Sequence, residues 1–318
     1  MGSSWAGVAS GATHARAGRM RILFVSATRI GDAVLSTGLL DHLLRAYPSA
    51  RFTIACGPVA EGVFARMPRR DATWIMDKRR GDLHWLALWR QAVRCWWDLV
   101  VDLRGSALAF LVPARRRAVM RGGRRPGHRL NHLAGTLRLA PPPLPVGWWN
   151  AEDDRVAAAL LPADAPLVGL GPTANWAGKV WPADRFVALF RALEAARPGL
   201  RPVVFAGPGE AERAMAAPVL AALPQAIDLS GRLSLPEASA CLARCALFVG
   251  NDSGLMHLAG AAGAPTLGLF GPTPASEYGP RGRKTAFVLA DGPPGQTGME
   301  HLPVEAAAQA ALALMVPA

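Results

Sequence analysis

The segment from Phe248 to Thr273, FVGNDSGLMHLAGAAGAPTLGLFGPT, constrains the fold more than any other part of the chain. It continues an apolar run, residues 246–249, which predicts a buried strand. Asp252-Ser253-Gly254 then stand where a helix should begin, because apolar residues follow them at helical spacing. A second apolar run occupies residues 265–270. Strand, small-residue turn, helix and strand in this order predict half of a nucleotide-binding α/β layer.

A turn of this kind has two interpretations. Unpaired N–H groups and the positive end of a helix meet at one spot, which suits a diphosphate. Asp and Ser are also common helix caps, so the segment taken alone fits a well-capped helix in any α/β protein equally well.

Short apolar runs alternate with amphipathic segments along the rest of the chain. We expect strands over residues 21–25, 52–55, 74–76, 99–103, 167–170 and 203–206. We expect helices over residues 33–47, 183–196, 210–223, 238–245 and 304–315. Alternation of this kind predicts parallel, doubly wound sheets.

A proline-rich stretch, residues 141–145, divides the chain, because prolines continue neither a helix nor a central strand. The fold class that we expect is α/β, with two Rossmann-like, doubly wound domains, residues 20–145 and 146–318, that face a central cleft. Ligands would bind at the carboxyl ends of the strands. Residues 1–19 are small and polar, and we expect them to form a disordered extension.

The composition indicates a cytoplasmic protein. Asp98, Asp102 and Arg104 interrupt the apolar stretch from Cys95 to Val112, which argues against a transmembrane helix there, and residues 1–19 lack the apolar core of a signal peptide. The four cysteines show neither disulfide nor zinc spacing, which is typical of thiols in a reducing compartment.

The net charge of +12 is concentrated in the first half of the chain. Residues 20–150 contain 21 Lys and Arg against 8 Asp and Glu, whereas residues 151–318 contain 12 against 15. Such a field attracts nucleic acid, an anionic membrane surface or a phosphorylated acceptor. No RRM, KH or zinc-finger signature accompanies the charge, so we do not expect nucleic acid as the partner.

In each half, one candidate residue follows the first strand. Asp32 follows Gly31, and it either caps a helix or faces the cleft as a general base. Lys179, the only lysine between residues 79 and 283, either offers a point charge to a phosphate or is a solvated loop residue.

Three further candidates follow later strands. Glu210 and Glu212 come after the strand over 203–206, where either acid could bind ribose hydroxyls or simply favour the first turn of a helix. His257 lies one turn beyond Ser253, so it could reach the same phosphate or be structural.

Together these motifs resemble glycosyltransferase family 9, which includes the ADP-heptose:lipopolysaccharide heptosyltransferases. The resemblance covers the chain from about Met20 to the C-terminus, in the family's order. It rests on Gly31-Asp32, Lys179-Val180-Trp181-Pro182, Asp252-Ser253-Gly254-Leu255-Met256-His257-Leu258 and Leu269-Phe270-Gly271-Pro272-Thr273.

The resemblance implies a GT-B fold with an N-terminal acceptor domain and a C-terminal nucleotide-sugar domain. It implies a metal-independent, inverting transfer from ADP-heptose to a lipopolysaccharide core, with Asp32 as the catalytic base. The donor-binding residues that it implies are Thr173, Lys179, Glu210, Glu212, Leu233, Asp252, Ser253, Gly254 and His257.

Each donor residue receives a role from the resemblance. Lys179 supports the diphosphate, and the turn from Asp252 to His257 holds the phosphates and the sugar. Either Glu210 or Glu212 holds the ribose, and the backbone of Leu233 meets adenine. Family members often carry Thr or Ser closer to the lysine than Thr173, which is a departure of this chain from the pattern.

The resemblance also implies that the protein uses neither a metal nor another cofactor. It implies an anionic glycolipid acceptor and a peripheral position at the cytoplasmic face of the inner membrane, bound through the basic domain. The alternatives are a transferase for another nucleotide sugar and glycan, a GT-B sugar-nucleotide epimerase, and a non-catalytic nucleotide- or nucleic-acid-binding protein. A dehydrogenase is disfavoured because residues 27–32 lack the Gly-x-Gly-x-x-Gly turn.

Overall fold

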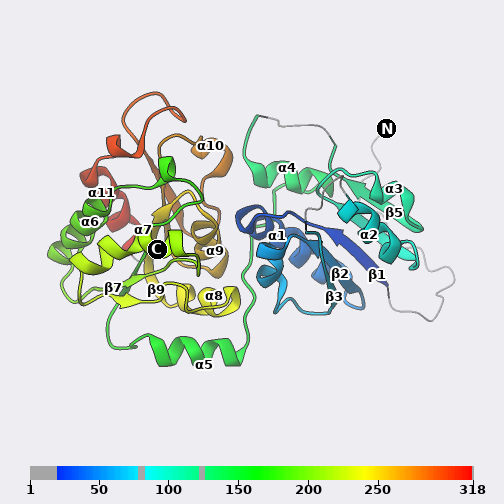
Figure 1. Cartoon of the computed structure of the whole chain (residues 1–318), viewed down its shortest axis with the longest axis horizontal. Coiled ribbons are helices and arrows are strands. Elements are labelled where there is room, and N and C mark those ends of the chain that lie inside the picture. Colours follow the sequence, from blue (N-terminus) through cyan, green and yellow to red (C-terminus); the bar gives the residue numbers. More distant parts are fainter. Residues whose placement is uncertain (1–19, 78–82, 122–125, 317–318) are drawn as a thin grey trace.

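The computed structural model describes residues 20–77, 83–121 and 126–316. It contains two parallel α/β halves that lie side by side (Figure 1). The expected extension, residues 1–19, lies outside the described residues, and its disorder stays a prediction. Among the described residues, every helix is too short or too polar to cross a membrane.

The first half alternates strands and helices around one sheet. Its elements are β1 (Arg21–Val25), α1 (Ile30–Ala46), β2 (Arg51–Cys56), the 3-10 helix η2 (Pro58–Phe64), β3 (Arg70–Ile75), α2 (Leu83–Ala92), β4 (Trp97–Asp102), α3 (Leu108–Leu111), β5 (Ala114–Val119) and α4 (Arg129–Thr136). The strands are all parallel, in the order β3-β2-β1-β4-β5. Because successive side chains of a strand point to opposite faces, Phe24 packs on the α1 side and Leu23 on the α2 and α3 side.

The second half repeats the plan with a larger parallel sheet. Its elements are α5 (Ala151–Leu160), β6 (Leu167–Gly171), η4 (Ala177–Lys179), α6 (Ala183–Ala196), β7 (Arg201–Val204), α7 (Glu210–Ala222), β8 (Ile227–Asp228), α8 (Leu235–Ala243), β9 (Cys245–Asn251), α9 (Gly254–Ala262), β10 (Thr266–Phe270), α10 (Ala275–Tyr278), β11 (Thr285–Leu289), η5 (Met299–His301) and α11 (Val304–Met315). The strand order is β11-β10-β9-β6-β7-β8.

In each sheet the order of strands reverses at one point. The reversal falls between β1 and β4 in the first sheet and between β6 and β9 in the second. Open α/β sheets bind their ligands at the carboxyl ends of the strands beside such a reversal. Asp32 follows β1, Lys179 follows β6 and Asp252 follows β9. The topology therefore places these candidates at the two positions where ligands are expected.

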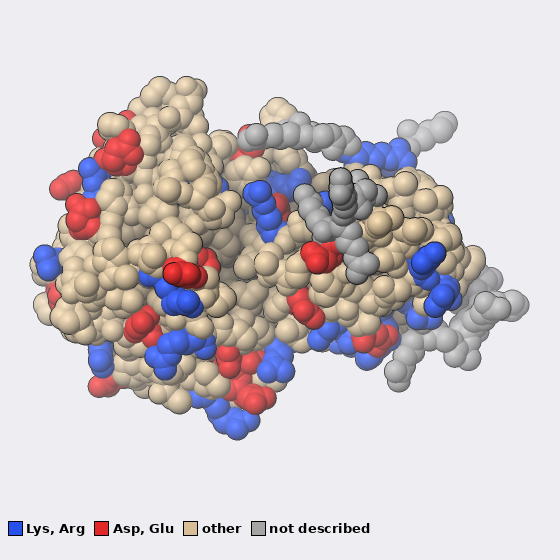
Figure 2. All heavy atoms as spheres, in the orientation of Figure 1, with Lys and Arg blue, Asp and Glu red and all other residues tan. Residues whose placement is uncertain are grey.

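The two halves pack directly against each other. Residues 143–147 run between α1 and α9, where the Val146 N–H donates to Thr37 Oγ1 at 2.8 Å and the Gly147 N–H donates to the Ala261 carbonyl at 2.9 Å. One buried cluster includes side chains of both halves, and the surface is hollowed between them (Figure 2). The segment that we expected to be a linker is thus packed in place, although the boundary between residues 145 and 146 stays a prediction.

Three local differences from the expected elements have clear causes. β5 was not expected, because Arg115 to Arg117 hide the alternation of an edge strand in which Ala118 is buried. α8 begins three residues early because Ser234 and Glu237 form a capping box. It also ends at Ala243, so residue 245 begins β9 instead of ending the helix.

Candidate active site

The N-terminal ends of α1 and α9, one from each half, are in direct contact. A Cβ on Gly31 would lie 3.0 Å from His257 Cδ2, and a Cβ on Gly254 would lie 2.9 Å from Ile30 Cγ2. Glycine on both sides therefore allows the two helix ends to approach this closely. The contact sets the first turn of α1, with Asp32, against the turn that begins α9.

Asp32 does not cap a helix. α1 begins at Ile30, and the side chain of Arg29, the N-cap residue just before it, makes no capping hydrogen bond. The Asp32 carboxylate instead accepts a hydrogen bond from Arg129 of α4, with 3.2 Å between Nε and Oδ1. Both side chains are partly exposed, so this pair contributes little to stability, and its clearer effect is to fix the orientation of the carboxylate. Arg129 was not predicted, because nothing in the sequence separates it from the arginines around it.

Lys179 and Asp252 form an ion pair across the reversal point of the second sheet. Lys179 Nζ lies 2.5 Å from Asp252 Oδ2, and the two side chains are only 17% and 8% exposed. The carboxylate fixes the direction of the ammonium. An ammonium has three donors, so the pair leaves two for a further acceptor such as a phosphate oxygen. Lys179 is therefore not the solvated loop residue of the simpler interpretation.

Ser253 is the N-terminal cap of α9. Its Oγ accepts the Met256 N–H at 3.5 Å, and Gly254 is the first helical residue. The helix begins where β9 ends, so its positive end lies beside the Lys179–Asp252 pair. Ser253 thus caps the helix and Asp252 pairs with Lys179, while the binding of a diphosphate by this turn stays a prediction.

His257 is buried one turn into α9, with 5% of its surface exposed. Burial lowers its pKa, and this effect outweighs the negative charges of Asp252 and Asp32, which raise the pKa; Lys179 lowers it further. The imidazole is therefore neutral near pH 7 and offers one N–H donor. The charges that act on it come from both halves, so His257 lies between the two groups of candidate residues.

Three buried polar atoms near this site have no hydrogen-bond partner among the described residues: Asn251 Nδ2, His257 Nδ1 and Thr273 Oγ1. Asn251 Oδ1 does accept the Trp181 N–H at 3.1 Å, which joins the Lys179 loop to the end of β9. Buried polar atoms are normally paired. Three such atoms around α9 and the ends of β9 and β10 indicate a site suited to a polar ligand. Asn251 was not predicted.

Glu210, Glu212 and Leu233 form a second group, beside β7 and β8. A Cβ on Gly231 would lie 3.0 Å from Pro208 Cα, so the loops that follow these two strands touch. Glu210 is exposed at the start of α7. The Glu212 carboxylate folds back against the same loop, and Leu233 is half-buried. The structure gives the two acids different surroundings, which the sequence could not separate.

Thr173 lies in the loop between β6 and η4, and its side chain is buried. The next polar residue, Asn175, is exposed. Among the described residues no hydrogen bond joins Thr173 to Lys179 or Asp252, and its phosphate role stays a prediction.

His128 links α4 to the second half. Its Nδ1 accepts the Leu130 N–H at 3.1 Å as a helix cap, so the proton is on Nε2, which donates to the Gly279 carbonyl at 2.9 Å. Burial lowers the pKa of His128 to about 4, because it outweighs the hydrogen bond to Gly279. This neutral histidine fixes the start of α4, and so Arg129 beside it, relative to both halves. No sequence pattern indicated it.

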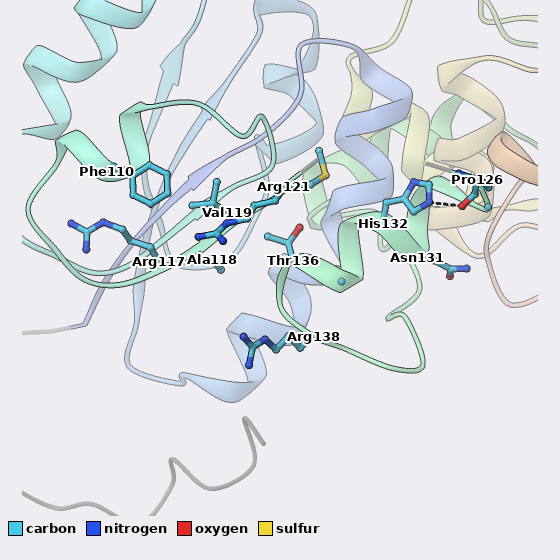
Figure 3. Close-up of a pocket in the computed structure, with 13 residues that line it drawn as sticks. Phe110, Arg117, Ala118, Val119, Arg121, Pro126, Asn131, His132, Thr136 and Arg138 are labelled. Atoms are coloured by element: carbon cyan, nitrogen blue, oxygen red, sulfur yellow. Dashed lines mark hydrogen bonds between the residues drawn. The ribbon is translucent and has the colours of Figure 1, made fainter. Parts of the chain in front are cut away.

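A pocket of about 550 Å³ opens in the first half between α3, β5 and α4 (Figure 3). Its charged side chains are all arginines: Arg117, Arg121 and Arg138. Met120 also lines it, and its sulfur lies 3.9 Å from Arg129 Nη1. The pocket therefore borders the Arg129–Asp32 pair, and it is large enough to hold a sugar unit.

The described titratable residues were compared with the ligand sets of metal centres. Among the described residues, no group of three or more His, Cys, Asp and Glu side chains could hold a metal ion. The four cysteines are free thiols, as expected, and three of them are buried.

Comparison with known proteins gives one family. Residues 142–298 match the model of glycosyltransferase family 9 (heptosyltransferase). The chain is 25% identical to the lipooligosaccharide heptosyltransferase 2 of Haemophilus ducreyi, over 86% of this chain and 90% of that protein. It is 28% identical to the lipopolysaccharide heptosyltransferase 1 of Pseudomonas aeruginosa, over 86% and 85%.

Solved structures share the fold. A family 9 glycosyltransferase from Veillonella parvula superposes with a TM-score of 0.77 at 22% identity, over 93% of this chain and 97% of that one. The ADP-heptose lipopolysaccharide heptosyltransferase II of Escherichia coli gives 0.73 at 21% identity, over 93% and 98%. The two Rossmann-like halves are thus a GT-B fold, as expected. The family match and the relatives that span most of its length show that the chain belongs to glycosyltransferase family 9 and is a glycosyltransferase.

Proposed function

We propose that this protein is an inverting, metal-independent heptosyltransferase that moves a heptose from ADP-heptose to a lipopolysaccharide core acceptor. The observation that carries the proposal is the contact between the ends of α1 and α9. It brings the first turn of α1, which carries Asp32, to the Asp252–His257 turn of the other half, where Asp252 pairs with Lys179. The names of the relatives support heptose as the sugar.

The second half would hold the donor. Negative charge grows on the diphosphate as the bond to the sugar breaks, and fixed positive charges in a site with little water stabilise it best. Lys179, the N-terminus of α9 and the neutral N–H of His257 supply that stabilisation. Because a lysine and a helix end can replace a divalent cation in this role, the proposal needs no metal. Glu212 and Leu233 line the loops that would take the ribose and adenine.

The first half would hold the acceptor and the base. Asp32 takes the proton from an acceptor hydroxyl while that oxygen forms its bond to the anomeric carbon, and the bond from this carbon to the diphosphate breaks. The base and the leaving-group site lie on opposite halves, which suits attack from the side opposite to the diphosphate and hence inversion. The arginines of the pocket beside Arg129 suit an anionic glycolipid at the inner membrane.

A panel of nucleotides tests the donor class. We expect ADP and ADP-heptose to raise the unfolding temperature. At a hundredfold excess over Kd, the bound ligand adds about 3 kcal/mol to the free energy of unfolding. Stabilisation by UDP- or GDP-sugars instead would favour a transferase for another donor. RNA or duplex DNA binding at physiological salt, without any response to ADP, would favour a non-catalytic role and overturn the proposal.

A further inference from the structure

We propose that the outer face of α2 and α3 docks on an anionic membrane surface. This α2–α3 face is defined by the side chains of Leu83, Leu86, Phe110 and Leu111. That the acceptor is anchored in this membrane rests on the proposed function, whereas the docking of the α2–α3 face is inferred from the surface of the protein alone.

The four side chains are large, apolar and exposed. Their exposed fractions are 56% for Leu83, 44% for Leu86, 57% for Phe110 and 61% for Leu111. Single exposed leucines are common, but four on two adjacent helices form a patch that marks an interaction site.

The two helices hold these side chains on one surface. α2 turns His84, Leu88 and Ala92 inward, which leaves Leu83 and Leu86 outward. The Trp89 indole N–H donates to the Leu111 carbonyl at 3.0 Å, so the end of α3 lies against α2. The surface over α2 and α3 is largely uncharged in Figure 2, with Lys and Arg side chains at its margins.

Arginines outnumber acidic residues around this face, although Asp77 and Asp82 stand just before Leu83 in the sequence. Between Leu83 and Arg121 the sequence contains seven arginines and only two acids, Asp98 and Asp102. Asp98 is engaged by the Arg21 backbone N–H, and Asp102 is fully buried. Arg90 on α2 and Arg94, just past the end of α2, are exposed. Apolar residues with arginines beside them are the pattern of a helix that lies in an anionic lipid interface.

The alternative occupant, a second copy of this chain, is disfavoured by the same charges. A symmetric dimer would bring identical patches together, and with them the arginines of both copies. Like charges placed face to face oppose such an interface.

The α2–α3 face is also continuous with the acceptor side of the site. Phe110 belongs to it and lines the pocket of Figure 3, which Met120 connects to Arg129 and Asp32. Arg121 and Arg138 lie in that pocket. A glycolipid that rises from the membrane beside Phe110 would therefore present its anionic groups to these arginines before its hydroxyl reaches Asp32.

Co-sedimentation of the full chain with vesicles that contain no acceptor tests the docking. We expect binding to mixed phosphatidylcholine and phosphatidylglycerol vesicles, weaker binding to phosphatidylcholine alone, and weaker binding at high salt. Leu86→Ser with Leu111→Ser should reduce binding by roughly tenfold or more. Phe110→Ser should reduce it several-fold, whereas the matched control Phe287→Ser, 48% exposed on β11, should not.

Unchanged ADP binding and thermal unfolding will show that the variants are folded. Binding of the α2–α3 variants at the wild-type level would overturn the proposal, as would wild-type protein that ignores anionic vesicles. A wild-type dimer that the same substitutions convert to a monomer would overturn it in favour of a second copy. None of these results depends on heptosyl transfer, so a failure here is distinguishable from a failure of the proposed function.

Discussion

At the scale of single residues, the site consists of two ion pairs, one in each half. Asp32 pairs with Arg129, and Asp252 pairs with Lys179. The first pair is partly exposed and available to solvent, as a base needs to be. The second is nearly buried, so removing one partner should affect stability and donor binding differently.

The Lys179–Asp252 pair can be tested by a double mutant. Lys179→Met leaves a nearly buried carboxylate without its partner, and we expect the free energy of unfolding to fall by roughly 3 kcal/mol. Adding Asp252→Asn should restore most of that stability. ADP affinity should stay at least about tenfold weaker in both variants, because the cation for the diphosphate is gone. Calorimetry and urea unfolding measure the two effects. Wild-type ADP affinity in the double variant would contradict the assigned role of Lys179.

Arg129 is expected to act through Asp32. Arg129→Ala should lower kcat by about 10–100-fold because the carboxylate is no longer oriented, and the KM for the donor should stay unchanged. Arg129→Lys should recover part of kcat, since it restores a cation but not the guanidinium geometry. Steady-state kinetics with varied donor decide this, and a wild-type kcat in Arg129→Ala would show that the ion pair does not matter.

The residues of the site divide into those that sequence could reveal and those that it could not. Asp32, Lys179 and Asp252 stand in short motifs beside the glycines and helix starts that their chemistry needs. Arg129 and His128 act through contacts between α4 and distant elements. No local pattern encodes such contacts, so only the folded chain identifies them.

At the scale of elements, α1 is held by the segment that links the halves. A Cβ on Gly38 would lie 2.5 Å from the Leu144 carbonyl oxygen, which is backbone and cannot turn aside. Gly38→Ala should therefore destabilise the protein by roughly 1–3 kcal/mol. Gly135→Ala in α4 is the matched control, because its Cβ would meet nothing within 4 Å. It should be neutral or stabilising by up to about 1 kcal/mol. Equal unfolding midpoints for both variants would show that the linker is not packed on α1.

The contact between α4 and the second half should depend on pH. The pKa of His128 is about 4 in the folded protein, and its ordinary value is 6.5. Between these values the unfolded chain binds more protons, so stability is fully present above pH 6.5 and is lost as the pH falls toward 4. His128→Gln should flatten this part of the urea-unfolding profile. His257, whose pKa is also lowered, should leave a residual slope. A variant with the wild-type profile would contradict this account of His128.

The elements were predictable where apolar spacing was plain. β1, α6 and α11 have the predicted bounds. In β1 the apolar residues form one unbroken run, and in the two helices they recur at helical spacing from end to end. β5 was missed because an edge strand needs few buried side chains, and three arginines occupy half of its six positions. Its place next to β4 depends on pairing that sequence spacing does not show.

At the scale of the whole molecule, the proposed roles of the two halves match their net charges. The basic first half faces the proposed acceptor and membrane, and the nearly neutral second half carries the proposed donor site. The two-domain α/β plan was predictable from alternation and the proline run. The contact between Gly31 and His257 was not, because it depends on how the halves dock.

The central claim is that Asp32 of one half acts as the base for a donor that is bound by the other half. The most direct measurement compares Asp32→Asn with Asp41→Asn, a control on the same helix, in transfer from ADP-heptose and in ADP-heptose binding. We predict that Asp32→Asn lowers kcat by roughly 10²–10⁴-fold and leaves the Kd for the donor unchanged, whereas Asp41→Asn changes neither. Turnover of Asp32→Asn at the rate of Asp41→Asn would contradict the account.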